Sequence, residues 1–212
     1  MDPNLTNFFD DHWRKSLEDH ESASILPQLE TFGPYFNGKK GRVLDLGSGR
    51  GQHALWFARH GWHADAFDLS SVAVEHLQKV ATFWKRFYPE GSVEARVADV
   101  GVTDLTRQYD AITLFNLSHY FSVEKWRELV DRCRDHTVSG GVHLLHIHLD
   151  SECASVIRQI HNVYPPMFFR EEEICGQYRD WEVLESRLEN DLAPTPVGPQ
   201  PHRLLWLVVR KP

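Results

Sequence analysis

Residues 43–51 read Val-Leu-Asp-Leu-Gly-Ser-Gly-Arg-Gly, and no other stretch of the chain says as much about its fold. An apolar strand runs into the acidic residue Asp45, and Gly47, Gly49 and Gly51 follow at every second position. Glycine lets backbone N–H groups approach a ligand where a Cβ atom would clash. Asp45 lies near the carboxyl end of the strand, where open parallel sheets bind their ligands. A carboxylate at this place disfavours a diphosphate and favours a cationic ligand.

Two classes of cofactor fit a glycine-rich turn of this kind. The dinucleotide fingerprint is G-x-G-x-x-G, in which a helix dipole holds the diphosphate. Gly47 and Gly49 match its first two glycines, but Gln52 stands at the third, and Asp45 would repel phosphates. S-adenosylmethionine instead carries an ammonium and a sulfonium group. The loop therefore favours S-adenosylmethionine, with a nicotinamide or flavin dinucleotide and a purely structural turn as the alternatives.

Acidic residues also follow the next two predicted strands. Asp68 ends the second strand, where a carboxylate can accept hydrogen bonds from both ribose hydroxyls of an adenosine. The alternative role for Asp68 is to cap the helix that begins after it. Asp99 follows the third strand and is placed to bind an adenine amino group, although a single acid there is more often a solvated turn residue. Three acids after three successive strands together predict an adenosine-type ligand.

The rest of the chain alternates between strand and helix patterns. Strands are predicted at residues 42–46, 63–68, 93–97, 110–115 and 142–148, and helices at residues 52–60, 70–86 and 122–135. Strands joined by helices indicate a parallel sheet with right-handed crossovers. After a predicted helix at 171–178, strands at 181–188 and 204–209 are joined by a proline-rich loop, which suggests an antiparallel pair at one edge. Residues 7–36 read as one or two helices.

Composition limits the class of protein. The chain has 212 residues, of which 42% are hydrophobic, and its formal net charge is −7. This suits one well-packed domain and argues against a broad attraction to nucleic acid or anionic lipid. Its 3 cysteines are widely spaced, which indicates a reducing compartment rather than a disulfide framework. With no signal-peptide pattern and no apolar run of roughly 20 residues, we expect a cytoplasmic protein without a membrane partner.

On these motifs, residues 41–148 resemble the class I S-adenosylmethionine-dependent methyltransferases. The matching segments are the glycine-rich loop, Asp68, Ala98-Asp99-Val100, Tyr109-Asp110-Ala111-Ile112 and Ser139-Gly140-Gly141. Within that family the chain is most similar to the small-molecule branch of TehB-like tellurite-resistance and thiopurine methyltransferases. The segments that carry this narrower similarity are Phe8-Phe9-Asp10-Asp11-His12-Trp13, the run from Phe168 to Ile174, Tyr178-Arg179-Asp180-Trp181-Glu182-Val183 and the closing strand at 203–211.

The resemblance implies a fold, a domain organisation and a cofactor site. The fold is a three-layer α/β, Rossmann-like architecture with a mostly parallel seven-stranded sheet and an antiparallel last strand. One domain spans residues 1–212, with an N-terminal helical cap (1–40), a cofactor-binding core (41–150) and an acceptor-side segment with the terminal strands (151–212). The cofactor, S-adenosylmethionine, would leave as S-adenosylhomocysteine. Its implied binding residues are Asp45, Gly47, Ser48, Gly49, Gly51, Asp68, Leu69, Asp99, Val100 and Asn116.

The acceptor side carries three candidate residues. A sulfonium methyl group is already activated, so a base is needed only if the acceptor atom carries a proton. His119, after the fourth strand, is the first candidate for that base because a neutral imidazole is available at cell pH; a polar loop residue is the alternative reading. His202 and Arg203 precede the last strand, where the family often has basic residues, and are candidates for binding the acceptor, with a surface loop as the alternative.

The expected acceptor is a small molecule. The chain lacks the Asn/Asp-Pro-Pro-Tyr/Phe signature of methyltransferases that act on amino groups of nucleic-acid bases or glutamine. With the acidic net charge, this disfavours a nucleic-acid partner. The family suggests a thiol, selenol or tellurium species, and an oxygen or nitrogen acceptor stays open. The alternative to an enzyme is a regulatory or scaffold protein that binds the cofactor without turnover.

Histidines raise the question of a metal. His146 and His148 alternate on the fifth strand and therefore face one side of the sheet, and Asp150 follows. With His119 or His202 they could bind zinc or iron. We expect no metal and interpret these side chains as polar imidazoles that line the acceptor pocket.

Aromatic segments predict a cover for the site. Phe8, Phe9 and Trp13 of the N-terminal helical region and the residues of segment 151–170 are expected to form a lid. Such a lid would exclude water and cover an apolar or soft acceptor.

Overall fold

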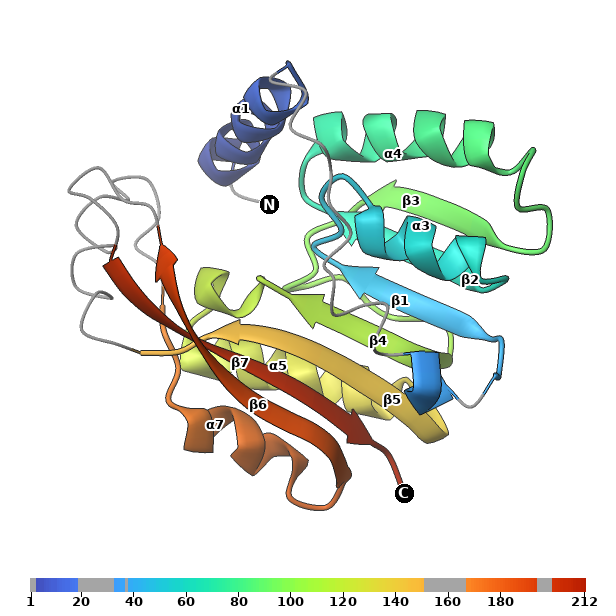
Figure 1. The fold of residues 1–212 in the computed structure, drawn as a ribbon. Coiled ribbons are helices and arrows are strands. Elements are labelled where there is room, and N and C mark those ends of the chain that lie inside the picture. Colours follow the sequence, from blue (N-terminus) through green and yellow to red (C-terminus); the bar gives the residue numbers. More distant parts are fainter. Residues whose placement is uncertain (1–2, 19–32, 37, 151–166, 194–199) are drawn as a thin grey trace.

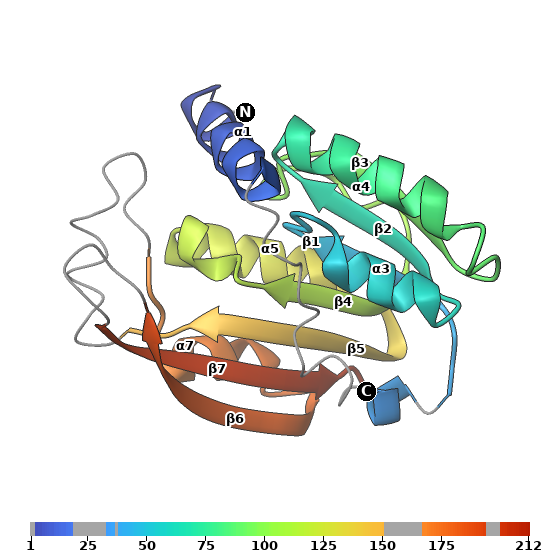
Figure 2. The ribbon, with the colours of Figure 1, turned by 45° about the horizontal axis from the view of Figure 1, so that its top comes forward.

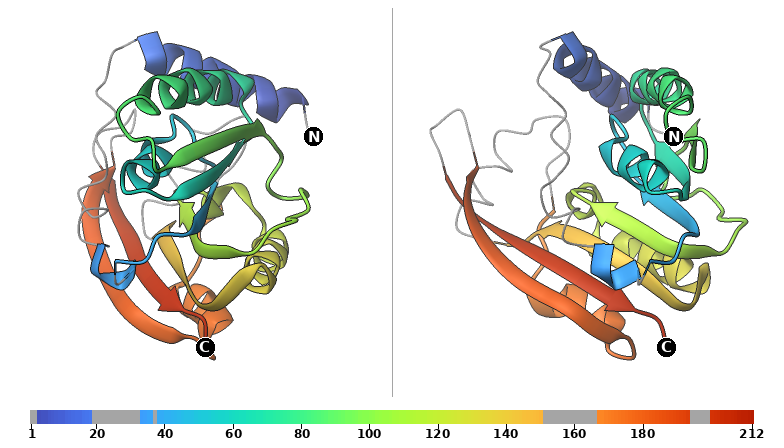
Figure 3. Two further views of the ribbon diagram at one scale, coloured as in Figure 1. Left: turned by 90° about the vertical axis from the view of Figure 1, so that its right-hand side faces the viewer. Right: turned by 45° about the vertical axis from the view of Figure 1, so that its right-hand side comes forward.

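The computed structural model describes residues 3–18, 33–36, 38–150, 167–193 and 200–212, arranged around one twisted sheet (Figure 1; Figure 3). The strands of this part of the chain are β1 Arg42–Leu46, β2 His63–Asp68, β3 Ser92–Val97, β4 Tyr109–Phe115, β5 Thr137–His148, β6 Glu182–Ala193 and β7 Gln200–Arg210. The helices are α1 Pro3–Glu18, α3 Gln52–Arg59, α4 Ser71–Trp84, α5 Val123–Asp135 and α7 Glu171–Cys175. Short 3-10 turns are η1 Gly33–Phe36, η2 Ser118–Tyr120 and η3 Gly176–Tyr178.

The strand order of the sheet is β3-β2-β1-β4-β5-β7-β6. β1 lies between β2 and β4 and runs parallel to both, with Leu44 opposite Asp65 on β2 and Ile112 on β4. β7 runs antiparallel to β5 and to β6. The predicted seven-stranded, mostly parallel sheet with an antiparallel last strand is confirmed. Because the strand order reverses between β1 and β4, the carboxyl ends of these strands open a crevice at the topological switch point.

Helices cover both faces of the sheet, which gives the predicted three layers (Figure 2). α3 and α4 lie on one face, and α5 and α7 lie on the other. On the first face Trp56 of α3 packs in a core with Val43 and Trp206. On the second face Trp126 of α5 packs in a core with Leu44 and Ile112. Burial on both faces explains why β1 and β4 are almost continuously apolar.

Several predicted boundaries agree with the observed ones because local signals set them. β1 and β2 begin and end where predicted. The hydroxyls of Ser70 and Ser122 cap α4 and α5 by accepting hydrogen bonds from the N–H groups of Ala73 and Lys125. Gly61 has a φ of 84°, the left-handed conformation that follows a helix end.

Other boundaries differ because tertiary pairing extends the strands. β5 begins at Thr137 because Gly140, with a φ of 74°, forms an irregularity inside the strand rather than a turn before it. β6 and β7 are longer than predicted because they pair along a long hairpin. The predicted helix at 171–178 is α7 followed by η3.

The predicted helical region at 7–36 is partly described. α1 begins earlier than predicted, at Pro3, and η1 lies at the C-terminal end of the predicted region. Residues 19–32, between them, lie outside the described residues. Residues 151–166 of the predicted lid also lie outside them. In the described parts of the chain, no helix combines the length and apolar character needed to cross a bilayer.

Candidate functional site

A cavity of about 270 Å³ lies at the carboxyl edge of the sheet. Loops after four strands line it with Gly47, Ser48, Gly49, Arg50, Asp68, Leu69, Ala98, Asp99, Val100, Phe115, Asn116 and Leu117, and α1 lines it with Leu5, Phe9, His12 and Trp13. The structure thus brings together the predicted cofactor residues, except Asp45 and Gly51, which do not line the cavity.

The glycines of the loop have two different roles. Gly49 has a φ of 51°, and a Cβ atom on it would lie 2.6 Å from the indole of Trp13, so its bare backbone forms a wall of the cavity. Gly51 has a φ of 78°, and a Cβ atom there would lie 2.1 Å from Leu77 of α4. The first glycine therefore allows the indole of Trp13 on α1 to approach the loop at the cavity, whereas the second allows α4 to pack closely against the loop.

Asp68 connects the glycine loop to the start of α4. Its Oδ2 accepts a hydrogen bond of 2.7 Å from the N–H of Gly49, and its Oδ1 accepts one of 2.8 Å from the N–H of Ser70. Burial raises the pKa of this carboxyl above its ordinary value, and the two N–H donors oppose that shift. Since each carboxylate oxygen has two lone pairs, Asp68 can still accept further hydrogen bonds from a ligand in the cavity.

Asp45 lies behind the loop rather than in the cavity. Its side chain is 1% exposed. Oδ1 accepts a hydrogen bond of 2.6 Å from the hydroxyl of Thr113, and Oδ2 accepts one of 3.2 Å from the N–H of Ala54. Burial raises the pKa of Asp45 to about 6. In this arrangement the carboxylate fixes β1, β4 and α3 relative to one another beneath the loop.

Two buried polar atoms at the cavity have no hydrogen-bond partner among the described residues, Ser48 Oγ and His53 Nε2. Burial lowers the pKa of His53 to about 3, so its imidazole is neutral. His53 was not among the predicted site residues. The available signal was its place in the first turn of the helix that follows the glycine loop, where a side chain can reach a ligand of that loop.

Helix α1 covers the cavity and is attached at two points. Asp10 accepts hydrogen bonds from the hydroxyls of Ser70 and Ser71, at 2.5 and 3.1 Å, at the start of α4. Arg50 of the glycine loop donates to the carbonyl of Ser16 at the other end of α1. Phe9 of α1 packs edge-on against Tyr120, with ring centroids 5.0 Å apart. Phe9 and Trp13 of the predicted lid therefore lie over the cavity.

Next to the cavity, three imidazoles meet at the ends of β4, β5 and β7. Nδ1 of His148 is hydrogen-bonded to Nε2 of His202, and Nε2 of His148 lies 3.0 Å from Oδ1 of Asn116. The ring centroids of His119 and His148 are 4.9 Å apart. Two candidates for the acceptor side, His119 and His202, thus come together through His148. Arg203 is exposed and follows buried His202 on β7. Since successive strand residues face opposite sides of the sheet, Arg203 lies on the side away from His202.

A fourth imidazole, His146, lies deeper in the same face. It stacks on Trp206 with a centroid distance of 4.0 Å, and its ring nitrogens have no hydrogen-bond partner among the described residues. Burial, followed by its proximity to His53 and His202, lowers the pKa of His146 to about 4. In the described ranges, no three His, Cys, Asp or Glu side chains are arranged to hold a metal ion. Within this cluster, burial therefore keeps His146 and His148 neutral, so each of these rings can donate one hydrogen bond and accept one.

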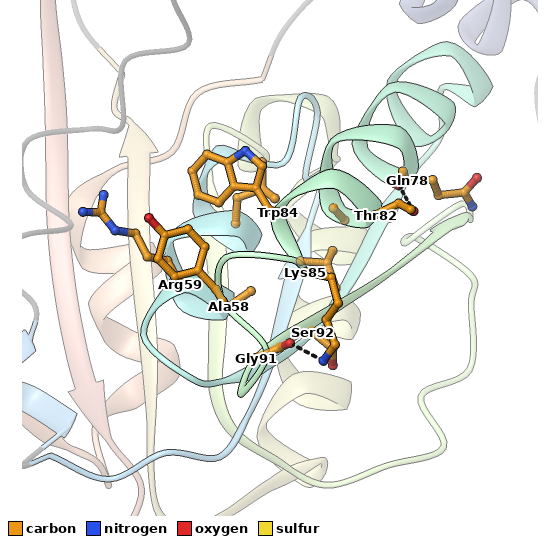
Figure 4. Close-up of a pocket in the computed structure, with 12 residues that line it drawn as sticks. Ala58, Arg59, Gln78, Thr82, Trp84, Lys85, Gly91 and Ser92 are labelled. Atoms are coloured by element: carbon orange, nitrogen blue, oxygen red, sulfur yellow. Dashed lines mark hydrogen bonds between the residues drawn. The ribbon is translucent and has the colours of Figure 1, made fainter.

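A second cavity, of about 330 Å³, lies between α3 and α4 at the opposite end of the sheet (Figure 4). Two of the polar side chains drawn there bind the protein's own backbone. Lys85 donates to the carbonyl of Gly91 at 2.8 Å, and Thr82 donates to that of Gln78 at 2.8 Å. Because it lacks the strand-end loops and their acidic residues, this cavity does not have the features of the cofactor site.

Comparison with known proteins identifies the family to which this chain belongs. A family model described as a methyltransferase domain matches residues 17–190. The probable S-adenosyl-L-methionine-dependent methyltransferase TehB of Haemophilus influenzae is 22% identical over 145 residues, which cover 68% of this chain and 47% of that protein. Ribosomal RNA small subunit methyltransferase C of Alcanivorax borkumensis is 41% identical over 56 residues, or 26% of this chain and 16% of that protein. The chain spans about half the length of the TehB relative, 47%.

Solved structures share the fold. The crystal structure of TehB from Haemophilus influenzae superposes with a TM-score of 0.75 at 18% identity, covering 96% of this chain and 67% of that one. The 1,6-didemethyltoxoflavin-N1-methyltransferase of Burkholderia thailandensis, solved with bound 1,6-didemethyltoxoflavin and S-adenosylhomocysteine, superposes with a TM-score of 0.71 at 17% identity. The superposition covers 98% of this chain and 87% of that one.

Proposed function

This chain belongs to the methyltransferase-domain family, and we propose that it transfers a methyl group from S-adenosylmethionine to a small-molecule acceptor. One observation carries the proposal: the cavity at the glycine loop adjoins the imidazoles at the ends of β4, β5 and β7. Asn116 belongs to both, because it lines the cavity and its Oδ1 contacts His148. A cofactor site beside a group of imidazoles can serve methyl transfer to an acceptor atom that carries a proton.

The chemistry of the cavity supports S-adenosylmethionine as the occupant. Gly49 lines the cavity with bare backbone, and the Asp68 carboxylate, which accepts a hydrogen bond from the Gly49 N–H, suits ribose hydroxyls. Ser48 Oγ and His53 Nε2 are buried at the cavity without a partner among the described residues. A buried polar group without a partner costs about 1–3 kcal/mol. A ligand that hydrogen-bonds to these atoms would recover that cost.

When bound, S-adenosylmethionine supplies a methyl group on a cationic sulfur. The residues of the chain would bind it, exclude water and handle the proton of the acceptor. Phe9 and Trp13 of α1 would shield the reaction from solvent, and Asp10 would hold α1 in place. His202 and His119, close to Asn116, are the candidates for taking a proton from the acceptor.

We propose further that the acceptor atom is a thiol or a related chalcogen. The similarity to TehB supports this class. A free thiol has a pKa of about 8.5 and a histidine about 6.5, so transfer of the proton to a neutral imidazole is only slightly uphill. The likeness to a methyltransferase solved with didemethyltoxoflavin makes a heterocyclic nitrogen acceptor the second candidate.

Calorimetry tests the cofactor. We expect S-adenosylmethionine and S-adenosylhomocysteine each to bind with a stoichiometry of one, and NAD⁺ to give no heat of binding. Binding of NAD⁺ in place of S-adenosylmethionine would show that the chain is a dinucleotide protein and would overturn the proposal.

Turnover tests the reaction. The purified protein would be incubated with S-adenosylmethionine and a panel of thiols, selenols, tellurium oxyanions, phenols, heterocycles and an RNA oligonucleotide. Release of S-adenosylhomocysteine that depends on a small molecule supports the proposal. Release that depends on RNA contradicts the small-molecule acceptor, and tight binding without turnover across the panel favours a scaffold protein.

A further inference from the structure

His148 lies between a cofactor-cavity residue and a candidate base. We propose that His148 is a positioning residue: it gives its Nε2–H to Asn116 and, through Nδ1, holds His202 in the tautomer whose basic nitrogen is Nδ1. This inference rests on the proposed function, because it assigns a supporting partner to the base of that reaction. The contacts that carry it are the 3.0 Å approach of His148 Nε2 to Asn116 Oδ1 and the hydrogen bond between His148 Nδ1 and His202 Nε2.

The direction of each hydrogen bond follows from the atoms involved. The Oδ1 of Asn116 is an amide oxygen and can only accept, so Nε2 of His148 carries the proton. A neutral imidazole has one N–H, and Nδ1 of His148 is therefore an acceptor. Nε2 of His202 must then be the donor of the bond between the two rings. Neutral His202 accordingly has its lone pair on Nδ1.

The surroundings keep His148 neutral. Among the described residues, the titratable groups that act on it are imidazoles from three elements, His119 of η2, His146 of β5 and His202 of β7. Burial, followed by proximity to these three rings, lowers the pKa of His148 to about 2. Its Nδ1 thus remains a hydrogen-bond acceptor at every pH at which His202 can act as a base.

The backbone of Asn116 presents this side chain from a rarely adopted conformation. Asn116 has a φ of 52°, and among the described residues it is the sole non-glycine residue with a positive φ. Its N–H donates to the carbonyl of His146 at 3.0 Å, which fixes the end of β4 against β5. Asparagine tolerates this region better than most residues. Such local strain is typically kept where the side chain has a functional position.

The arrangement resembles the orientation of a catalytic histidine by a carboxylate, with a neutral imidazole in the carboxylate's place. During transfer, the bond between the acceptor atom and its proton breaks, and the proton joins Nδ1 of His202. The electron pair of that bond stays on the acceptor atom and forms its new bond to the methyl carbon, while the pair of the departing carbon–sulfur bond goes to sulfur. The His202 imidazolium keeps its Nε2–H on Nδ1 of His148.

The tautomers can be measured in the protein without cofactor or acceptor. Two-bond ¹H–¹⁵N correlation spectra, assigned with single histidine variants, should show His148 and His202 each protonated at Nε2 and unprotonated at Nδ1. Asn116→Gly keeps the backbone conformation accessible and removes Oδ1, so a second His148 tautomer should appear. His143, whose ring is fixed by Thr137 and Tyr178, is the internal control and should not change. Protonation of His148 at Nδ1 in the unaltered protein would overturn the inference.

Kinetics separate positioning from a structural role. With an acceptor that gives turnover, His148→Phe should lower kcat by about 10- to 100-fold, less than the roughly 100- to 10,000-fold that a general base contributes, because His202 remains present. The cofactor dissociation constant should stay unchanged. Loss of the hydrogen bond to the His202 imidazolium should also move the acid limb of the pH profile to lower pH. His148→Gln, which keeps a side-chain acceptor, should recover part of the rate.

The possible results distinguish the inference from the function on which it rests. An unchanged kcat and acid limb in His148→Phe would refute the positioning role while leaving methyl transfer established. Absence of turnover in the unaltered protein would instead count against the proposed function. The measured tautomers of His148 and His202 would still show whether the two rings are hydrogen-bonded as proposed.

Discussion

Thr113, on β4, donates a hydrogen bond of 2.6 Å from its hydroxyl to Oδ1 of Asp45, on β1. The acidic residue that precedes the glycine loop is therefore engaged by the protein itself, and it does not line the cavity. Its carboxylate supports the loop from below, between the two strands that flank the switch point. A direct contact of Asp45 with a cationic ligand remains a prediction, whereas Asp68 already lines the cavity.

Asp45 should make stability depend on pH. Its folded pKa is about 6, whereas an aspartate in an unfolded chain has a pKa of about 3.9. The folded state therefore binds more protons between these values, and the free energy of unfolding falls as pH rises through this window. A shift of about two units corresponds to roughly 3 kcal/mol. Buried His53, His146 and His148 have lowered pKa values and contribute slopes of opposite sign in the same window, so the two proteins must be compared. In urea unfolding, the free energy of unfolding of the unaltered protein minus that of Asp45→Asn should fall as pH rises through the window; parallel curves for the two proteins would contradict the assignment.

Asp10 should hold α1 over the cavity. Burial raises the pKa of Asp10, but the hydrogen bonds from Ser70, Val72 and Ser71 together outweigh it and leave the pKa below its ordinary value. Asp10 is therefore an anion at the N-terminus of α4. Asp10→Ala should cost about 1–2 kcal/mol in capping and charge–dipole interactions. Hydrogen exchange should become faster in α1, and S-adenosylmethionine should bind more weakly. Asp11→Ala is the matched control, since Asp11 is exposed and pairs with Arg14 on the same helix; an equal effect of both variants would count against a specific attachment.

His143 should contribute to stability and not to binding. Thr137 donates its hydroxyl proton to the carbonyl of Cys133 and accepts from Nε2–H of His143, whose Nδ1 accepts from the hydroxyl of Tyr178. His143→Phe leaves the Tyr178 hydroxyl buried without this partner and should cost about 1–3 kcal/mol. In a double-mutant cycle with Tyr178→Phe the two losses should be less than additive. Additive losses, or a weaker affinity for S-adenosylhomocysteine, would contradict this role.

Asp68 should be needed for cofactor binding. It joins the Gly49 N–H to the start of α4 and faces the cavity. A hydrogen bond to a charged group contributes about 1.5–3 kcal/mol, so Asp68→Ala should weaken S-adenosylhomocysteine binding by about 10- to 100-fold. Asp104→Ala, at an exposed loop position outside the cavity, should leave the affinity unchanged. Thermal unfolding of both variants would show whether the loss of affinity results from a loss of folding. Normal affinity of a folded Asp68→Ala protein would show that Asp68 does not bind the cofactor.

Local signals made the core of the fold predictable from the sequence. Gly61 and Ser70 mark the ends of α3 and the start of α4, and the glycine loop marks the end of β1. The lengths of β5 and β6 were not predictable in the same way, because pairing with β4 across an irregularity extends β5 and pairing with β7 extends β6. Tertiary context, rather than local pattern, decides such extensions.

The candidate site was likewise predictable from the sequence only where local position determines it. The loop residues that line the cavity follow from position, since strand ends meet at one edge of a parallel sheet. The contact of His148 with His202 depends on the register between β5 and β7, in which His148 lies opposite Leu204. No local pattern specifies that register. The contact of Asp10 with Ser70 likewise joins segments 60 residues apart, and Thr113 approaches Asp45 because β1 and β4 are neighbours.

The transfer of a labelled methyl group tests the central claim most directly. The protein would be incubated with S-adenosylmethionine deuterated at the methyl group and with each small-molecule acceptor, and mass spectrometry would follow both products. We expect one acceptor to gain the deuterated methyl group in an amount equal to the S-adenosylhomocysteine released, and we expect His202→Gln to slow both together. Saturable binding of S-adenosylmethionine without labelled product from any acceptor would contradict the claim that this chain is a small-molecule methyltransferase.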